Sequence, residues 1–184
     1  MTIEIRRSQN DRVLELGGGA NPNVVPECMG GRDVNVDVRM CENANGQRTV
    51  DFTADFNEPL PIGSNDFDVV LSVFALEHVS WRKVPQLLGE MFRVVKPGGR
   101  VILVLPNTEA QLRWILDGCK NPARPSDGEF VEASRILFGD LDYPENSHRA
   151  YFSPNAIVYL LCQAGFVNVR TTPYGEIHTD MIVE

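Results

Sequence analysis

A run of three glycines near the start of the chain constrains the fold more than any other feature. It follows residues 12–16 (RVLEL), an apolar stretch with the composition of a β-strand. It precedes Asn21 and Pro22, a pair typical of a helix N-cap and the first helical position. Because glycine has no side chain, such a turn lets a ligand come close to the backbone. The sequence therefore predicts a strand, a ligand-facing turn at residues 17–19, and a helix.

Short β-branched runs alternate with helical patterns along the rest of the chain. We expect further strands at residues 33–38, 49–52, 67–72, 100–105, 166–171 and 177–183, and helices at residues 82–95, from 108, at 129–138 and at 154–164. The alternation predicts an α/β domain with a largely parallel sheet, closed by an antiparallel hairpin around residues 173–175. No repeat or domain boundary interrupts it, so residues 1–184 are expected to form one domain.

One segment stands out from this alternation because of its loops and polar connections. Residues 107–152 are expected to be an insertion, or lid, over the carboxyl edge of the sheet. That edge is where ligands bind in open α/β folds. We therefore expect this segment to supply part of the substrate side of the site.

The composition narrows the class of partner. Lysine and arginine total 17 against 25 aspartates and glutamates, a net charge of −8 that repels phosphate backbones and anionic membranes. No apolar run approaches the ~20 residues of a spanning helix, and the first residues lack a signal-peptide pattern. The four cysteines form no Cys-x-x-Cys pair, which predicts neither a zinc site nor a disulfide framework. We expect a cytoplasmic protein without nucleic-acid or membrane partners and without a metal.

Two acidic residues frame the glycine turn. Asp37 ends the second expected strand, 20 residues beyond Gly17, a spacing that suits a carboxylate accepting both ribose hydroxyls of an adenosine. Pro22 stands where a dinucleotide-binding turn would have its third glycine, and Glu15 would repel a phosphate but attract an ammonium group. The pattern favours an adenosine that carries a cationic amino-acid arm, which describes S-adenosylmethionine.

Further segments complete a family pattern. They are residues 13–19 (VLELGGG), 36–37 (VD), 53–61 (TADFNEPLP), 67–70 (FDVV) with 76–79 (LEHV), 94–100 (VVKPGGR), and 153–166 from Ser-Pro to Ala-Gly-Phe. On these motifs the chain resembles the class I S-adenosylmethionine-dependent methyltransferases, and in particular their small-molecule, methyltransferase type 11-like branch. The resemblance covers residues 12–183. It implies a Rossmann-like three-layer sandwich with a seven-stranded, mostly parallel sheet whose last strand is antiparallel.

The resemblance also implies a cofactor and the residues that hold it. The methyl donor is expected to be S-adenosylmethionine, and its product S-adenosylhomocysteine. The matching positions are Glu15, Gly17, Gly18, Gly19, Asp37, Val38, Asp55, Phe56 and Ser72. Within the family pattern the acid at Asp55 contacts the adenine amino group, and the next residue lines the adenine pocket. Asn21 and Pro22 depart from the small residues usual after the glycines.

Two histidines are candidates for a catalytic base, since the imidazole pKa suits proton removal near neutral pH. His78 follows the fourth expected strand, and His148 lies just before the last helix. The non-catalytic alternatives are that His78 lines the cofactor pocket and that His148 positions the insertion. Arg149 and Tyr151 are candidates for holding a polar or anionic acceptor. Glu77 is expected to be structural.

The leading hypothesis is a methyltransferase, monomeric or homodimeric, that acts on an oxygen, nitrogen or carbon atom of a sugar, lipid precursor or other metabolite. Alternatives are an aminopropyl transferase, a non-catalytic module that binds the cofactor, and a nicotinamide-dependent oxidoreductase, which Pro22 disfavours. A DNA methyltransferase is disfavoured because the chain has neither a Pro-Cys nucleophile nor an Asn/Asp-Pro-Pro motif after the fourth strand.

Overall fold

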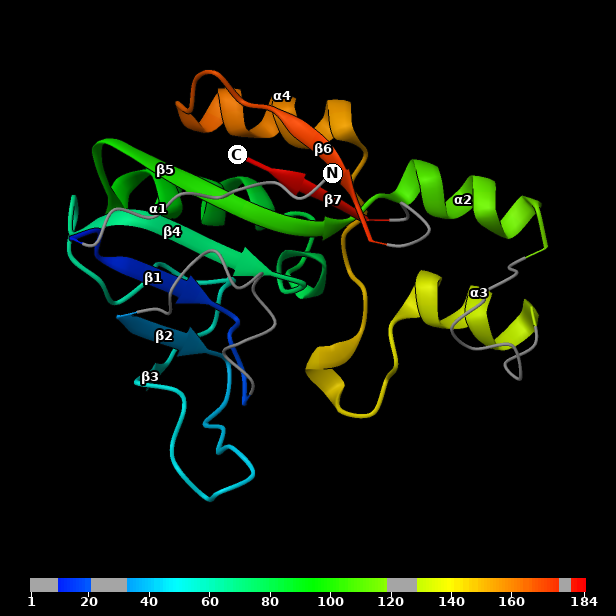
Figure 1. Cartoon of the computed structure of the whole chain (residues 1–184), viewed down its shortest axis with the longest axis horizontal. Helices are drawn as coiled ribbons and strands as arrows, with labels where there is room; N and C mark the ends of the chain where they lie inside the picture. Colours follow the sequence, from blue (N-terminus) through cyan, green and yellow to red (C-terminus); the bar gives the residue numbers. More distant parts are fainter. Residues whose placement is uncertain (1–9, 21–32, 119–128, 176–179) are drawn as a thin grey trace.

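A seven-stranded sheet forms the centre of the molecule (Figure 1). The computed structural model describes residues 10–20, 33–118, 129–175 and 180–184, so the expected helix start at Asn21 and Pro22 lies outside the described residues. The strands are β1 (Val13–Leu16), β2 (Val34–Asp37), β3 (Phe52–Thr53), β4 (Phe67–Val73), β5 (Val95–Pro106), β6 (Thr171–Tyr174) and β7 (Asp180–Val183).

The order of the strands is β3-β2-β1-β4-β5-β7-β6. Strands β1 to β5 run parallel to one another, and β7 runs antiparallel to both β5 and β6. The expected α/β class, the seven strands and the antiparallel last strand are therefore confirmed.

Four helices surround the sheet in the described part of the chain. They are α1 (Val84–Val94), α2 (Thr108–Leu116), α3 (Glu129–Phe138) and α4 (Pro154–Ala164), with short 3-10 turns η3 (Leu76–His78) and η4 (Pro144–Asn146). Helices α1 and α4 pack together beside the sheet, and α2 and α3 lie beyond the carboxyl ends of β4 and β5 (Figure 1). Helix α4 shows why its bounds were predictable, because the Ser153 hydroxyl caps its start by accepting from the Ala156 N–H and Gly165 ends it with a φ of 109°.

The position of β6 corrects the sequence-based expectation. A strand was expected at residues 166–171 and a turn at 173–175, but β6 spans Thr171–Tyr174 and includes Pro173. Strand β6 lies at the edge of the sheet, where a residue without an N–H is tolerated. The preceding residues instead close the last helix onto the domain, since the Phe166 ring meets Phe92 edge to face at 5.1 Å.

Alternating side chains divide the core between the two faces of the sheet. In β5, Val101, Leu103 and Leu105 belong to the larger buried cluster, whereas Ile102 and Val104 belong to a smaller one. Helix α1 packs against β4, β5 and α4 on the side of the larger cluster. None of the described helices combines the length and the apolar composition needed to cross a bilayer.

The segment at residues 107–152 lies beyond the carboxyl ends of β4 and β5 (Figure 1). It contains α2, α3 and η4. Two backbone bonds hold its final part against η3, because the N–H groups of Arg149 and Ala150 both donate to the Glu77 carbonyl, at 2.7 and 3.0 Å. This arrangement places residues from the segment beside the ends of the parallel strands.

Candidate functional site

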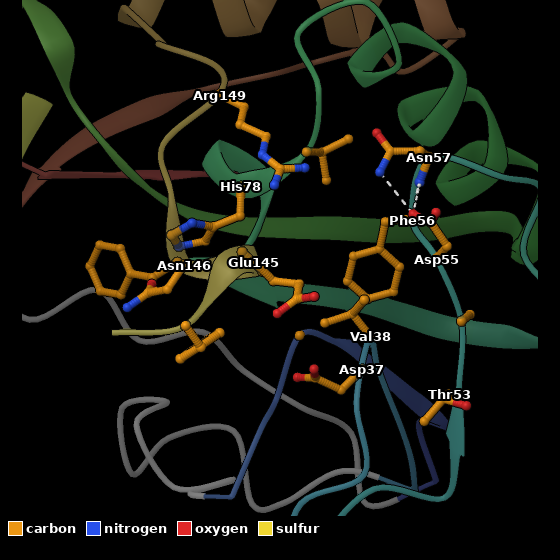
Figure 2. A pocket seen from close by; sticks show the side chains of 16 residues that line it. Asp37, Val38, Thr53, Asp55, Phe56, Asn57, His78, Glu145, Asn146 and Arg149 are labelled. Carbon is orange, nitrogen blue, oxygen red and sulfur yellow. Dashed lines mark hydrogen bonds between the residues drawn. The ribbon is translucent and has the colours of Figure 1, made fainter. Parts of the chain in front are cut away.

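A cavity of about 430 Å³ opens at the carboxyl edge of the sheet. One side, here called the strand side, consists of Gly17, Asp37, Val38, Asp55 and Phe56, which follow or end β1, β2 and β3. The other side, here called the segment side, consists of residues between 143 and 149. Figure 2 shows the two sides facing each other across the cavity, with His78 beside the segment side.

Gly17 ends β1 at a point where only glycine fits. Its φ is +82°, and an added Cβ would lie 2.3 Å from the Cβ of Ala75. Its N–H donates to the Val36 carbonyl at 2.8 Å, which ties the turn to β2. Gly17 is the turn residue that lines the cavity, and the ligand-facing role expected for the turn stays a prediction.

The Asp37 carboxylate accepts hydrogen bonds from two backbone N–H groups, one in the glycine turn and one just after β2. One carboxylate oxygen accepts from the Gly19 N–H at 3.0 Å, and the other accepts from the Arg39 N–H at 3.3 Å. A carboxylate offers about four acceptor positions, so two remain for ligand hydroxyls. The bonds fix the carboxylate at the cavity wall, where a ribose would be recognised.

Asn35 is a site residue that the sequence analysis missed. It is fully buried in β2, and its side chain accepts from the Gly18 N–H at 3.2 Å and donates to the Thr49 carbonyl at 2.8 Å. It thereby holds the glycine turn from below. The available signal was a polar residue at an apolar position of an alternating strand, since buried amides are kept by their hydrogen bonds.

The residues after β3 form the remaining wall of the strand side. Asp55 accepts from the backbone and the side chain of Asn57, at 2.9 and 2.8 Å. The Asn57 side-chain oxygen in turn accepts from the Ser80 N–H at 3.2 Å. The Phe56 ring is 9% exposed and presents an apolar face to the cavity (Figure 2). An apolar ring beside a carboxylate suits a purine that carries an amino group.

The other expected cofactor residues do not line this cavity among the described residues. Gly18 and Gly19 belong to the turn and contribute backbone, as described above. Glu15 and Ser72 are buried in β1 and β4, at 3% and 2% exposure. Their proposed contact with a cofactor stays a prediction.

His78 and His148 come together although 70 positions separate them in the chain. Their ring centroids are 5.2 Å apart, and the rings are tilted by 56°. The Nδ1 atom of His78 faces the Ser147 carbonyl at 3.2 Å, and that of His148 faces the Ile136 carbonyl at 2.9 Å. Because a carbonyl only accepts, each Nδ1 carries the proton and each Nε2 of the neutral ring is bare. Burial lowers the pKa of both histidines, which keeps the rings neutral near pH 7.

Glu77 lies beside the two histidines in the interior. Its side chain is 3% exposed, and burial, with the charge of Asp180 as a smaller cause, raises its pKa to about 8. One carboxylate oxygen is 3.9 Å from Nε2 of His78, and the other is buried without a hydrogen-bond partner. Nothing in the local sequence signalled that a carboxylate here would be enclosed.

Arg149 and Tyr151, the two residues expected to hold the methyl acceptor, line different cavities in the structure. Arg149 lines the cavity, with its guanidinium donating to Ser147 Oγ and to the Pro144 carbonyl, each at 3.1 Å. The ring of Tyr151 lines a separate groove beside Trp81, and its hydroxyl donates to the Leu137 carbonyl. Arg149 thus lies at the cavity and Tyr151 at the separate groove, and the acceptor contacts expected for both stay predictions.

Tyr143 joins the two sides of the cavity and was also missed. The guanidinium of Arg39, at the end of β2, lies 3.6 Å from the centre of its ring. Burial raises the pKa of its hydroxyl. Such a cation–π contact between positions 39 and 143 has no signal in a single sequence, because it depends on how the segment folds back.

The family model and the curated relatives that match this chain are all methyltransferases. A methyltransferase domain family matches residues 3–171. The chain is 31% identical over 115 residues to the ubiquinone/menaquinone biosynthesis C-methyltransferase UbiE of Cereibacter sphaeroides, a match that covers 60% of this chain and 43% of that protein. It is 31% identical over 120 residues to the demethylmenaquinone methyltransferase of Anoxybacillus flavithermus, covering 62% and 47%. The chain thus spans less than half the length of these curated relatives.

Solved structures share the fold at low sequence identity. An S-adenosylmethionine-dependent methyltransferase from Mesorhizobium loti superposes with a TM-score of 0.59 at 16% identity, covering 99% of this chain and 92% of that one. A methyltransferase from Thermotoga maritima, described as a possible histamine N-methyltransferase, gives a TM-score of 0.58 at 19% identity, covering 94% and 80%. These similarities concern the fold alone.

Proposed function

Because this chain belongs to the methyltransferase domain family, we propose that it transfers a methyl group from S-adenosylmethionine to a small-molecule acceptor. The single observation that carries the proposal is the cavity at the carboxyl edge of the sheet. It brings Gly17 and Asp37, which suit an adenosine, to one side and His78 with Arg149 to the other. A donor and an acceptor would meet between them.

The described residues fit S-adenosylmethionine. Gly17 lines the cavity at the end of β1 without a side chain, Asp37 keeps acceptor positions for ribose hydroxyls, and Phe56 offers a face to the adenine. When bound, the cofactor supplies a methyl group on a positively charged sulfur. The protein's own contribution is to align the acceptor with that methyl group and to keep water away.

The part of the cavity lined by His78 and Arg149, here called the acceptor end, favours a nucleophile that must lose a proton. His78 lines this end as a neutral imidazole with a bare Nε2. In the proposal it accepts the proton that an acceptor hydroxyl or acidic carbon releases, and Arg149 balances the negative charge that develops. Since the curated relatives are named for methylation in quinone biosynthesis, we favour a hydroxylated, quinone-type ring as the acceptor, methylated on carbon or oxygen.

The remaining expectations about partners are part of the proposal. We propose action in the cytoplasm as a monomer or homodimer, without nucleic acid. The net charge of −8 and the free thiols of Cys41 and Cys162 support this setting.

Titration of the protein with S-adenosylhomocysteine by calorimetry tests the cofactor side. We expect micromolar binding, weakened about 10- to 100-fold in Asp37→Asn, because a hydrogen bond to a charged group contributes roughly 1.5–3 kcal/mol. Glu109→Gln is the matched control, since this exposed carboxylate pairs with Arg113 on α2 and lies away from the cavity. It should bind as the unaltered protein does.

Methyl transfer is then measured with a short-chain demethylated hydroquinone as acceptor. Binding of the thioether together with transfer would support the full proposal, and we expect His78→Ala to slow transfer at least 100-fold. Binding without transfer to any acceptor tried would favour a non-catalytic module that senses the cofactor. No binding of S-adenosylhomocysteine would overturn the proposal.

A further inference from the structure

Three potential ligand atoms converge behind the acceptor end of the cavity. One comes from each of Glu77, His78 and His148, and all three lie within 4.8 Å of one another. The first two belong to η3, and the third comes from the stretch that leads into α4. Because η3 and this stretch are bound through the Glu77 carbonyl, the backbone holds the three side chains in place.

The two imidazoles are oriented as metal ligands are. Ligating histidines usually donate one ring N–H to a carbonyl or carboxylate, which fixes the ring and leaves the other nitrogen free for the ion. Both rings here have Nδ1 on a backbone carbonyl, at 3.2 Å for His78 and 2.9 Å for His148. Gly139 lets the end of α3 approach closely, since an added Cβ would meet the Asn146 carbonyl oxygen at 2.3 Å and His148 Cδ2 at 3.3 Å.

The carboxylate supplies an independent sign that a ligand is missing from this arrangement. Glu77 is 3% exposed, yet one of its oxygens has no hydrogen-bond partner. An enclosed carboxylate oxygen without a partner is costly, and buried charges are normally paired or bound to a metal. The side chain is aimed at the histidines, with its other oxygen 3.9 Å from Nε2 of His78.

We infer that Glu77, His78 and His148 form a site for one divalent transition-metal ion of the zinc class. Two imidazoles and a carboxylate suit zinc or iron(II) far better than magnesium or calcium, which prefer oxygen ligands. Ligands of a tetrahedral zinc ion lie ~3.3 Å apart, given bonds of about 2.0–2.2 Å. The present separations, all within 4.8 Å, are wider than that value, so the side chains would draw together as the ion binds.

Three protein ligands leave one coordination position open, as in catalytic zinc sites. His78 also lines the cavity, so the open position would serve the acceptor. This role rests on the proposed function. It would replace the role of base proposed above for His78, because Nε2 would bind the ion; the ion would lower the pKa of an acceptor hydroxyl, and the released proton would leave to solvent.

Binding of Zn²⁺ and Co²⁺ to the purified full chain, stripped with a chelator, tests the site. We expect one Zn²⁺ per chain at micromolar or tighter affinity and a visible absorption spectrum of low-coordinate Co²⁺. His148→Ala and Glu77→Gln should each weaken zinc binding by at least ~10-fold. Loss of a residue that only supports a metal ligand already costs about 10- to 100-fold in affinity, and loss of a ligand should cost no less. Glu109→Gln, an exposed carboxylate paired on α2, should leave the affinity unchanged.

The measurement needs neither cofactor nor acceptor, so its failure is distinct from failure of the proposed function. If Glu77→Gln does not fold, His148→Ala still tests the site. Circular dichroism shows whether each variant is folded. Zinc should also raise the Tm of the unaltered protein more than that of His148→Ala, since an ion that binds the folded state stabilises it. Equal zinc affinity in the unaltered protein and in folded His148→Ala, or no binding by either, would overturn the inference.

Discussion

The two sides of the cavity are built in different ways. On the strand side, Gly17 and Asp37 end neighbouring parallel strands, and their positions follow from the register of β1 with β2. On the segment side, residues near 145 line the cavity next to a stretch that is tied to η3, since the N–H groups of Arg149 and Ala150 donate to the Glu77 carbonyl. The strand side is therefore fixed by the sheet itself, whereas the segment side depends on a few long-range backbone bonds.

The difference also concerns what each side recognises. The strand side offers bare backbone, a fixed carboxylate and an apolar ring, which suit a ligand of constant structure. The segment side offers tyrosine, glutamate, asparagine and arginine side chains on a connection between helices, where a change of residues would alter the acceptor without disturbing the sheet. One side would then carry what the family shares, and the other what distinguishes this chain.

The largest expected effect comes from breaking the strand side at Gly17. Gly17→Ala should lower the free energy of unfolding by about 2–4 kcal/mol, because a positive φ costs roughly 1–2 kcal/mol for any other residue and a contact at the Ala75 methyl adds overpacking. Urea denaturation measures the change. Gly98→Ala is the matched control, since its φ is +81° but no atom lies within 4 Å of an added Cβ. Equal losses in the two variants would show that the close approach to Ala75 has no energetic weight.

A second, smaller loss of stability should follow from removing the carboxylate of Glu90, which binds the loop after β3 through the Leu60 N–H. Glu90 of α1 accepts from the Leu60 N–H at 2.8 Å and binds the guanidinium of Arg93 through both oxygens, at 2.8 and 2.7 Å. Glu90→Gln should lower the free energy of unfolding by about 1–2 kcal/mol at pH 7, as expected for charge-assisted bonds. Glu109→Gln, whose pair with Arg113 is exposed, should lose less than ~0.5 kcal/mol.

The same pair gives a pH dependence with a defined sign. The hydrogen bond from Arg93, with a smaller contribution from the Leu60 N–H, holds the pKa of Glu90 below its usual value. Its stabilisation is therefore complete above the unfolded-state pKa of about 4.3 and is lost as the pH falls through the lower native pKa. Urea denaturation from pH 7 to pH 3 should show the unaltered protein and Glu90→Gln converging in acid. A gap that stays constant would contradict this assignment.

The smallest expected effect tests whether the two sides are coupled. Arg39 and Tyr143 make the described cation–π contact between them, and such exposed contacts contribute about 0.5–1 kcal/mol. A double-mutant cycle with Arg39→Gln and Tyr143→Leu should give a coupling of that size in the binding free energy of S-adenosylhomocysteine. A coupling of zero would mean that the segment side closes without any help from the strand side.

Several features of the fold and the site were predictable because they are local. The strand before the glycine turn, the cap at Ser153 and the stop at Gly165 each depend on residues within a few positions. Gly17 and Asp37 were found from spacing along consecutive strands, which parallel pairing converts into proximity. The family match over residues 3–171 confirms the expected family and, with it, S-adenosylmethionine as the family's cofactor.

The sequence by itself determined the alternation of strands and helices, the glycine turn and the acid beside it, because periodicity and backbone freedom act over short distances. Only the tertiary structure decided that His148 would meet His78, that Glu77 would be enclosed beside them, and that Tyr143 would lie against Arg39. Those contacts join positions about 70 to 100 apart. They exist because strand register and the folding of residues 143–149 onto η3 bring the chain back to one edge of the sheet, and no local preference specifies that return.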